Sequence, residues 1–269
     1  MTGVIDHPDA SLIPTRGRIA QERVDAATRA IAFFVVAVVL IVGLWQGAID
    51  LFDLKPFVVP TPMSVLVALN QDWPKLGAAL GYTLRGTLFG LVISTSLALV
   101  LGTLFTLSDN LARAVMPLLI AIRTAPVLAI APLLILIFGR GQAISIAVVV
   151  IVSFFPILVN ATRGFRSTDA NALELMHVCG ATWLQTFFKV RLPFALPAIF
   201  TGLRAAATSG LLSAMLAEWL SGAPGLGTLI LEAESFRKLP LMWAGVVLAM
   251  AVAFAIFALT VRMERSVVK

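Results

Sequence analysis

"ELMHVCGATWLQTFFKVRLP", residues 174–193, is a polar, helix-forming insert between two long apolar runs. Gly180 divides it, because glycine alone adopts the left-handed backbone conformation without a Cβ penalty. Upstream, Thr168 and Asp169 supply an N-cap and an acidic first turn, and Pro193 stops the insert before the next apolar run. The pattern predicts two short helices joined at the glycine.

The second of these helices is expected over residues 181–190, with large apolar side chains on one side: Trp183, Leu184, Phe187 and Phe188. A loop that merely joins two membrane spans needs no such shape. Taken by itself, the pattern is that of an amphipathic hairpin lying on the membrane surface.

The composition of the chain is that of a membrane protein. Of its 269 residues, 59% are hydrophobic and 13% are charged, and the mean hydropathy is +0.99, whereas soluble domains average about 25% charged residues. A helix needs roughly 20 apolar residues to cross a bilayer. The sequence therefore predicts an all-α, polytopic membrane protein of about six transmembrane helices, at Ala30–Ile49, Gly77–Leu107, Val115–Phe138, Ala143–Ala161, Leu196–Leu220 and Leu241–Val261.

Lysines and arginines indicate the orientation, because short cytoplasmic loops carry an excess of them. With the N-terminus inside, 12 of the 20 fall on the cytoplasmic side, 5 on the outer side and 3 inside spans. We therefore expect both termini in the cytoplasm. The formal charge of +6 then reflects topology, and the dispersed basic residues do not favour nucleic-acid binding.

The sequence gives little indication of a catalytic site. His177 and Cys179 lie close together in the loop but lack the third and fourth ligands of a zinc site, and no nucleophile with a base or paired carboxylates is visible. We expect no enzyme, no catalytic residue and no metal. The alternative class is an ion-coupled secondary transporter, which usually shows carboxylates at mid-membrane and an internal repeat, and neither is visible.

Charged residues inside a span are costly and are functional hypotheses by default. Arg85 lies in the second span, and Arg204 lies near enough to the cytoplasmic end of the fifth to snorkel as an anchor. Arg123 precedes Pro126, so it either lines a pathway or caps the carbonyls that the proline frees. Glu218, the only carboxylate well inside a span, either caps the glycine-rich turn that follows or faces the exit of cargo.

Several segments together resemble one known family. The spacing of Glu174, Gly180, Val190, Leu192 and Pro193 resembles the EAA loop of ABC importer permeases, whose pattern is E-A-A, three residues, G, nine residues, an aliphatic, one residue, L-P. Five further segments look like successive blocks of the permeases for nitrate, sulfonate, taurine and pyrimidine precursors: VVPTPMSVLVAL (58–69), RTAPVLAIAPLLILIFGRG (123–141), FFPILVNATRGFRSTD (154–169), LPFALPAIFTGLR (192–204) and AEWLSGAPGLGTLI (217–230).

The resemblance implies a type I ABC importer permease fold and a role in transport. A coupling loop, residues 166–192, would seat in a cleft of a cytoplasmic ABC ATPase, contacting it through Asp169, Glu174, Leu175, Met176, His177, Gly180 and Ala181. For Glu174 the alternative is a solvated carboxylate on the helix surface. The family has alanines where this chain has Leu175 and Met176, so the fit to a particular ATPase is in question.

The resemblance also implies partners. A homodimer of permeases in the bacterial inner membrane would bind two ATPases, and a periplasmic or lipid-anchored binding protein would deliver the cargo. The chain has no G-x-x-x-x-G-K-[ST] motif, so ATP and Mg would belong to the ATPase and the chain would bind no cofactor. Domain boundaries are expected as a cytoplasmic tail (1–29), a permease domain (30–264) and a C-terminal tail (265–269).

The pathway and gate are expected to involve Arg85, Arg123, Pro126, Met215 and Glu218. Three arginines inside spans face one carboxylate, and an unpaired charge in a low-dielectric region is expensive. If Arg123 faces the pathway, the field there is positive. The expected cargo is then an organic anion or a polar heterocycle, and not a polyamine.

Overall fold

The computed structural model describes residues 16–267, and at residues 16–31, 34 and 128 it describes the backbone alone. The chain divides into two compact units, Met1–Pro62 and Met63–Lys269. The first unit contains α1 (Arg16–Leu51), which covers the expected first span and begins within the expected cytoplasmic tail. Its apolar part, Val35–Leu51, is by itself short for a membrane span.

The described part of the second unit consists of helices joined by short turns and loops. Its elements follow in the order α2 (Pro62–Gln71), α3 (Trp73–Leu107), α4 (Asp109–Thr124), α5 (Val127–Phe138), α6 (Gln142–Arg166), α7 (Ala170–Val178), α8 (Trp183–Thr186), the π-helix η2 (Phe187–Arg191), α9 (Leu192–Ser221), α10 (Leu226–Ser235) and α11 (Leu239–Val267). The last of these helices runs into the expected C-terminal tail.

Four helical stretches of the described chain are long and apolar enough to cross a membrane: Trp73–Leu107, Gln142–Arg166, Trp183–Ser221 and Leu239–Val267. A fifth span results if α4 and α5 count as one bent pair. With α1, these stretches correspond to the six apolar runs of the sequence. The prediction of an all-α, polytopic membrane protein is confirmed.

The third apolar run is not one straight helix. Helices α4 and α5 are bent by 102° relative to each other. Pro126 has no N–H and disfavours helical backbone at the residue before it, and Ala125 is indeed extended, with φ −64° and ψ 128°. The expectation of a single helix over Val115–Phe138 is therefore wrong, although Pro132 is accommodated within α5.

The helix at the end of the polar insert also differs from the expectation. It does not stop at Pro193, because α8 passes through η2 directly into α9, and the whole stretch Trp183–Ser221 is one candidate span. Pro193 lies in the first turn of α9. A proline is tolerated there, because the N–H groups of a first turn have no partner within their own helix. In this case the preceding π-helix continues the backbone.

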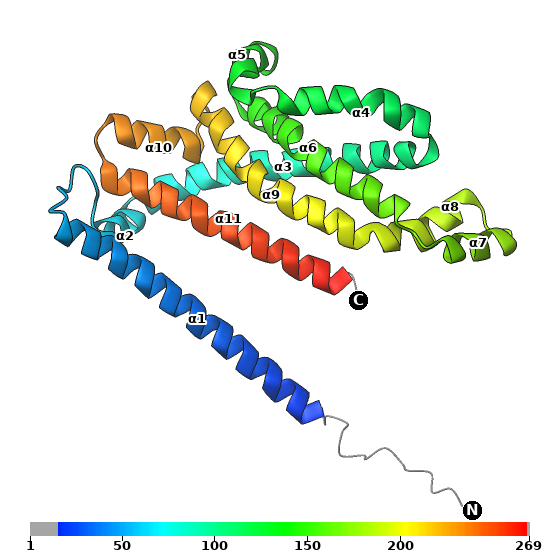
Figure 1. The fold of residues 1–269 in the computed structure, drawn as a ribbon. Coiled ribbons are helices and arrows are strands. Elements are labelled where there is room, and N and C mark those ends of the chain that lie inside the picture. Colours follow the sequence, from blue (N-terminus) through cyan, green and yellow to red (C-terminus); the bar gives the residue numbers. More distant parts are fainter. Residues whose placement is uncertain (1–15, 268–269) are drawn as a thin grey trace, which may run out of the picture. The chain divides into compact units, whose positions relative to one another are not determined.

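The core of the second unit lies where α6 packs between α3 and α9 (Figure 1). Its central cluster draws three buried residues from each of these helices: Leu91, Ala98 and Phe105 from α3, Val149, Ile157 and Leu158 from α6, and Ala206, Ala207 and Ala214 from α9. Helix α11 packs along α9 on the other side. Helix α10 lies at one end of this bundle, and α7 with α8 lies at the opposite end (Figure 1).

Small residues allow these helices to approach one another closely. A Cβ atom added at Gly90 of α3 would lie 2.5 Å from the Cβ of Val149 on α6, and one added at Gly202 of α9 would lie 2.9 Å from the carbonyl oxygen of Pro156 on α6. Between membrane helices, van der Waals packing of this kind replaces the hydrophobic driving force, because lipid tails are as apolar as leucine.

Gly90→Ala should therefore destabilise the second unit by about 1–3 kcal/mol, since the added methyl group overpacks the α3–α6 contact. Gly81→Ala is the matched control on the same helix, because a Cβ atom there meets nothing within 4 Å. The control should be neutral or stabilising through its better helix propensity. Thermal unfolding of the purified variants in detergent checks this, and equal melting temperatures would contradict the packing argument.

Candidate functional site

The polar insert folds as two short helices around a left-handed glycine. Asp169 is the N-cap of α7, where its side chain accepts a hydrogen bond from the backbone N–H of Asn171 (3.2 Å). Gly180 has φ +67° and follows the end of the helix directly. At the start of α8, Thr182 and Gln185 form a reciprocal capping box. The predicted left-handed Gly180 is confirmed, but the N-cap is Asp169 and not Thr168, so the first turn of α7 carries no acidic residue.

Aromatic contacts and one arginine hold this loop against the end of α6. Arg191 donates a hydrogen bond from Nη1 to the carbonyl oxygen of Phe165 (3.2 Å). The ring of Phe187 lies 5.4 Å from that of Phe165 and 5.3 Å from that of Trp183, measured between centroids. These contacts fix the loop to the membrane-spanning part, as a rigid element requires.

Several large apolar side chains of the loop are exposed. Four side chains are more than half exposed: Leu175 (63%), Val178 (77%), Leu184 (59%) and Phe188 (59%). Glu174 and His177 are also exposed, while Met176 and Ala181 are half-buried. Among the described residues, none forms a hydrogen bond with the Glu174 carboxylate. An exposed apolar surface with an available carboxylate suits a protein partner.

Glu218 lies fully buried at the opposite end of the bundle, near the end of α9. Its Oε2 accepts hydrogen bonds from the hydroxyl of Thr83 on α3 (2.9 Å) and from the backbone N–H of Gly227 at the start of α10 (3.1 Å). Of the two roles considered for Glu218, capping of the glycine-rich turn is therefore the one that its contacts support.

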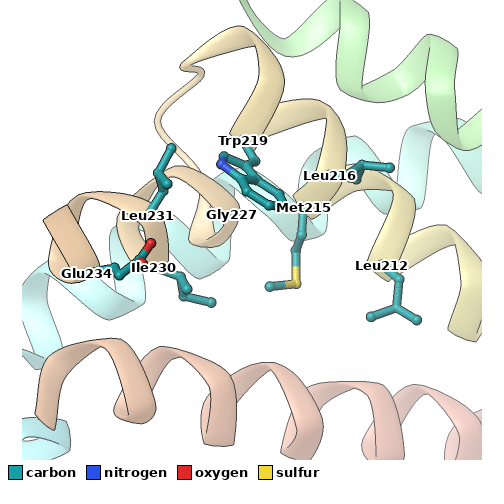
Figure 2. Close-up of a pocket in the computed structure, with 8 residues that line it drawn as sticks. All are labelled: Leu212, Met215, Leu216, Trp219, Gly227, Ile230, Leu231 and Glu234. Carbon is teal, nitrogen blue, oxygen red and sulfur yellow. The ribbon is translucent and has the colours of Figure 1, made fainter. Parts of the chain in front are cut away.

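A cavity of about 340 Å³ lies beside this turn, between α9 and α10 (Figure 2). Met215 lines it together with Leu212, Leu216 and Trp219 of α9, and Gly227, Ile230, Leu231 and Glu234 line it from α10. The two helices touch at Met215, since a Cβ atom at Gly227 would lie 1.9 Å from its carbonyl oxygen. Two of the predicted pathway residues, Met215 and Glu218, thus both contact Gly227 at the start of α10.

Arg123 and Pro126 lie at the break between α4 and α5, in a different place. Arg123 lines a cavity of about 420 Å³ whose other residues come from α4 to α6 and from α9: Ile122, Val127, Ile151, Val152, Pro156, Ala205 and Ser209. The guanidinium carbon lies 4.6 Å from the centroid of the Phe155 ring, a cation–π distance. No described carbonyl accepts a hydrogen bond from Arg123, so the capping role considered for it finds no support.

The other two intramembrane arginines differ in their partners. Arg204 forms an ion pair with Glu264 near the end of α11, and its guanidinium also lies 5.7 Å from the ring of Phe257. It therefore joins two spans, as an anchor would. Arg85 is exposed on α3 and forms no ion pair or hydrogen bond with the described residues, and it lines neither cavity described above.

Comparison with known proteins identifies the family. Residues 90–269 match the family described as "Binding-protein-dependent transport system inner membrane component". The chain belongs to this family of ABC importer permeases. The resemblance predicted from the sequence is thus confirmed, and the permease is a transport component and not an enzyme.

Two relatives and one solved structure show which proteins the permease is similar to. It is 35% identical to the formylaminopyrimidine transport permease of Halalkalibacterium halodurans, over 70% of this chain and 75% of that one. It is 30% identical to the riboflavin transport system permease of Chloroflexus aurantiacus, over 87% and 88%. A chain of the methionine ABC transporter MetNI, in an inward-facing conformation, aligns with a TM-score of 0.66 at 20% identity, over 74% of the permease and 99% of that chain. This likeness confirms the type I fold.

Sequence reasoning missed three residues that contact the charged side chains inside the spans of the permease. Thr83 binds Glu218 from 135 residues away, Glu264 pairs with Arg204 from 60 residues away, and Phe155 lies over Arg123. The pair Arg204–Glu264 had a usable signal, because both residues lie near the same predicted end of their spans. Nothing in the sequence singled out Thr83 or Phe155.

Proposed function

We propose that two copies of this permease form a homodimer, that residues 166–192 of each copy dock on one of two cytoplasmic ABC ATPases, and that a periplasmic or lipid-anchored binding protein delivers the cargo. The observation that carries this proposal is the exposed apolar surface of Leu175, Val178, Leu184 and Phe188 on a loop that leads without a break into a membrane-spanning helix.

Apolar side chains on this surface would supply much of the docking free energy. Burial of one large aliphatic or aromatic side chain contributes about 1.5–3 kcal/mol. Leu175 and Met176 are larger than the alanines of the EAA pattern, so we expect a wider groove on the cognate ATPase. Glu174 is exposed and free to accept hydrogen bonds from that partner, whereas the Asp169 carboxylate already caps α7.

The continuity of α8, η2 and α9 would transmit the movement of the ATPases. A flexible connection would absorb a displacement, but this segment is helical from Trp183 to Ser221. Its π-helical turn, Phe187–Arg191, lies at the junction with the membrane-spanning part. π-Helical turns are rare in proteins overall, but those that occur are often found at functional sites. ATP and Mg would be bound by the ATPases alone.

The orientation follows from the same loop. Arg204, in the first half of α9, pairs with Glu264 near the end of α11, and the coupling loop and the C-terminal end of α11 lie at one end of the bundle (Figure 1). We assign this end to the cytoplasm and the protein to the bacterial inner membrane, with both termini inside. Helix α10 is then on the side of the binding protein.

The cavity at Arg123 supports a preference for an organic anion or a polar heterocycle. The face of its guanidinium lies toward Phe155, which leaves the N–H groups at its edge for a ligand. Pro156 has no N–H to bond the carbonyl of Val152, and both residues line the cavity, so an acceptor is available beside the cation. The cargos named for the two relatives are heterocycles, and a polyamine would be repelled.

Gly180→Val should uncouple the complex while leaving membrane insertion intact. Valine at a left-handed position is strained by about 1–2 kcal/mol, which reorients α7 and should lower binding-protein-stimulated ATP hydrolysis roughly tenfold. Cys179→Val is the matched control, since φ there is −73°. The measurement is ATPase activity of the reconstituted complex. Stimulation equal to that of the wild type would sink the proposed docking role, and cargo uptake without any ATPase would favour an ion-coupled carrier.

The topology is testable through Cys179, the only cysteine, which is exposed. A membrane-impermeant thiol reagent should not label it in intact cells. In a Cys179→Ser background, the same reagent should label Ser235→Cys, because that position is exposed on α10 at the opposite end of the bundle. The reverse labelling pattern would invert the membrane orientation.

Arg123→Gln should reduce uptake of an anionic or heterocyclic cargo in reconstituted vesicles, since it removes the one charge that lines the cavity. We expect a loss of about tenfold, the usual value of one charge-assisted hydrogen bond. Arg113→Gln is the control, because it removes an arginine from the start of the same helix. Uptake that is unchanged in rate and in its dependence on cargo charge would remove Arg123 from the pathway.

A further inference from the structure

The hydrogen bonds around Glu218 join three helices through three side chains, those of Thr83, Glu218 and Thr228. The hydroxyl of Thr83 on α3 donates to Oε2 of Glu218 and accepts the backbone N–H of Leu226 (2.9 Å). The same hydroxyl lies 3.1 Å from the carbonyl oxygen of Ala79 on its own helix, but a carboxylate is the stronger acceptor. The hydroxyl of Thr228 on α10 donates to the backbone carbonyl of Glu218 (2.9 Å). Helix α10 is thereby tied to both α9 and α3.

The geometry of this junction is tight and not fully satisfied. A Cβ atom at Gly225 would lie 2.1 Å from the carboxyl carbon of Glu218, so no larger residue fits there without movement. Oε1 of Glu218 is buried and has no hydrogen-bond partner among the described residues. A buried carboxylate oxygen without a partner is destabilising. The position of the Glu218 carboxylate therefore depends on its contacts with Thr83 and Gly227.

Helix α9 connects this junction to the coupling loop. Glu218 lies near the end of a helical segment that starts at Trp183 within the loop. At 1.5 Å per residue, the two points are separated by roughly 50 Å along one segment. A displacement of α10 that acts on Glu218 is therefore applied to the same segment that carries Leu184 and Phe188, two of the four residues of the proposed ATPase-docking surface.

We propose that the Thr83–Glu218 hydrogen bond is the positioning contact through which the loaded binding protein, on reaching α10, changes the position of α9 and so stimulates the ATPases. Glu218 and Thr83 act here through α9 and touch no cargo. This inference rests on the proposed function, since it requires ATPases at the loop and a binding protein at the α10 end.

Substitution of Thr83 tests this contact in the complete complex. Thr83→Val keeps the shape of the side chain but removes the hydroxyl, and it should lower the stimulation of ATP hydrolysis by the loaded binding protein about tenfold or more, the value of one hydrogen bond to a charged group. Basal hydrolysis without the binding protein should be unchanged. Thr83→Ser, which restores the hydroxyl, should restore the stimulation.

Thr87→Val is the matched control one turn along α3. Thr87 is as fully buried as Thr83, but its hydroxyl bonds only the carbonyl of Thr83 within the same helix. If Thr87→Val and Thr83→Val reduce the stimulation equally, or if Thr83→Val leaves it intact, the positioning role is wrong. Absence of stimulation in the wild-type complex would instead contradict the proposed function.

Hydrogen exchange on the wild-type complex keeps the proposal testable if Thr83→Val does not assemble. The amides of Leu226 and Gly227 donate to Thr83 and Glu218, so a peptide over residues 223–229 should be protected. Its exchange should change when the loaded binding protein is added and stay the same with the empty one. Identical exchange under both conditions would overturn the proposal.

Discussion

Close packing of α6 against α3 and α9 is the interaction on which the other features of the permease depend. In a bilayer, apolar side chains gain little by leaving lipid for protein, so helices associate where small residues let their backbones approach. Gly90 and Gly202 provide such places on either side of α6. With α6 fixed, its last turn supports the coupling loop through Phe165, and its middle forms one wall of the cavity at Arg123.

The charged residues of the second unit differ in how their charge is stabilised. Arg204 has an ion-pair partner, Glu218 accepts two hydrogen bonds from other helices, and Arg123 has an aromatic ring. The first arrangement joins two spans, although the buried Nε of Arg204 has no hydrogen-bond partner among the described residues. Glu218 likewise has a buried oxygen without a partner, whereas the guanidinium of Arg123 lines a cavity.

A single helical segment, Trp183–Ser221, links the two ends of the bundle. At one end it carries exposed apolar side chains, and at the other it carries Glu218 and lines the cavity with Met215. A secondary transporter would need its energy source, a titratable or ion-binding site, near mid-membrane. Within this segment the carboxylate of Glu218 instead lies near one end, which suits movement driven from outside the membrane.

The sequence alone determined the membrane class, the helical fold, and the two short helices of the polar insert with the left-handed Gly180 between them, because these depend on composition and on short-range backbone preference. It also allowed the capping role of Glu218, whose Gly227 partner is nine residues away. Only the tertiary structure decided that Thr83 binds Glu218, that Glu264 pairs with Arg204, that the third span bends at Pro126 and that α8 continues past Pro193. The first two features depend on the rotation and register of one helix against another, which a period of 3.6 residues leaves open. The last two depend on the backbone at a proline, which can break a helix or be accommodated in its first turn.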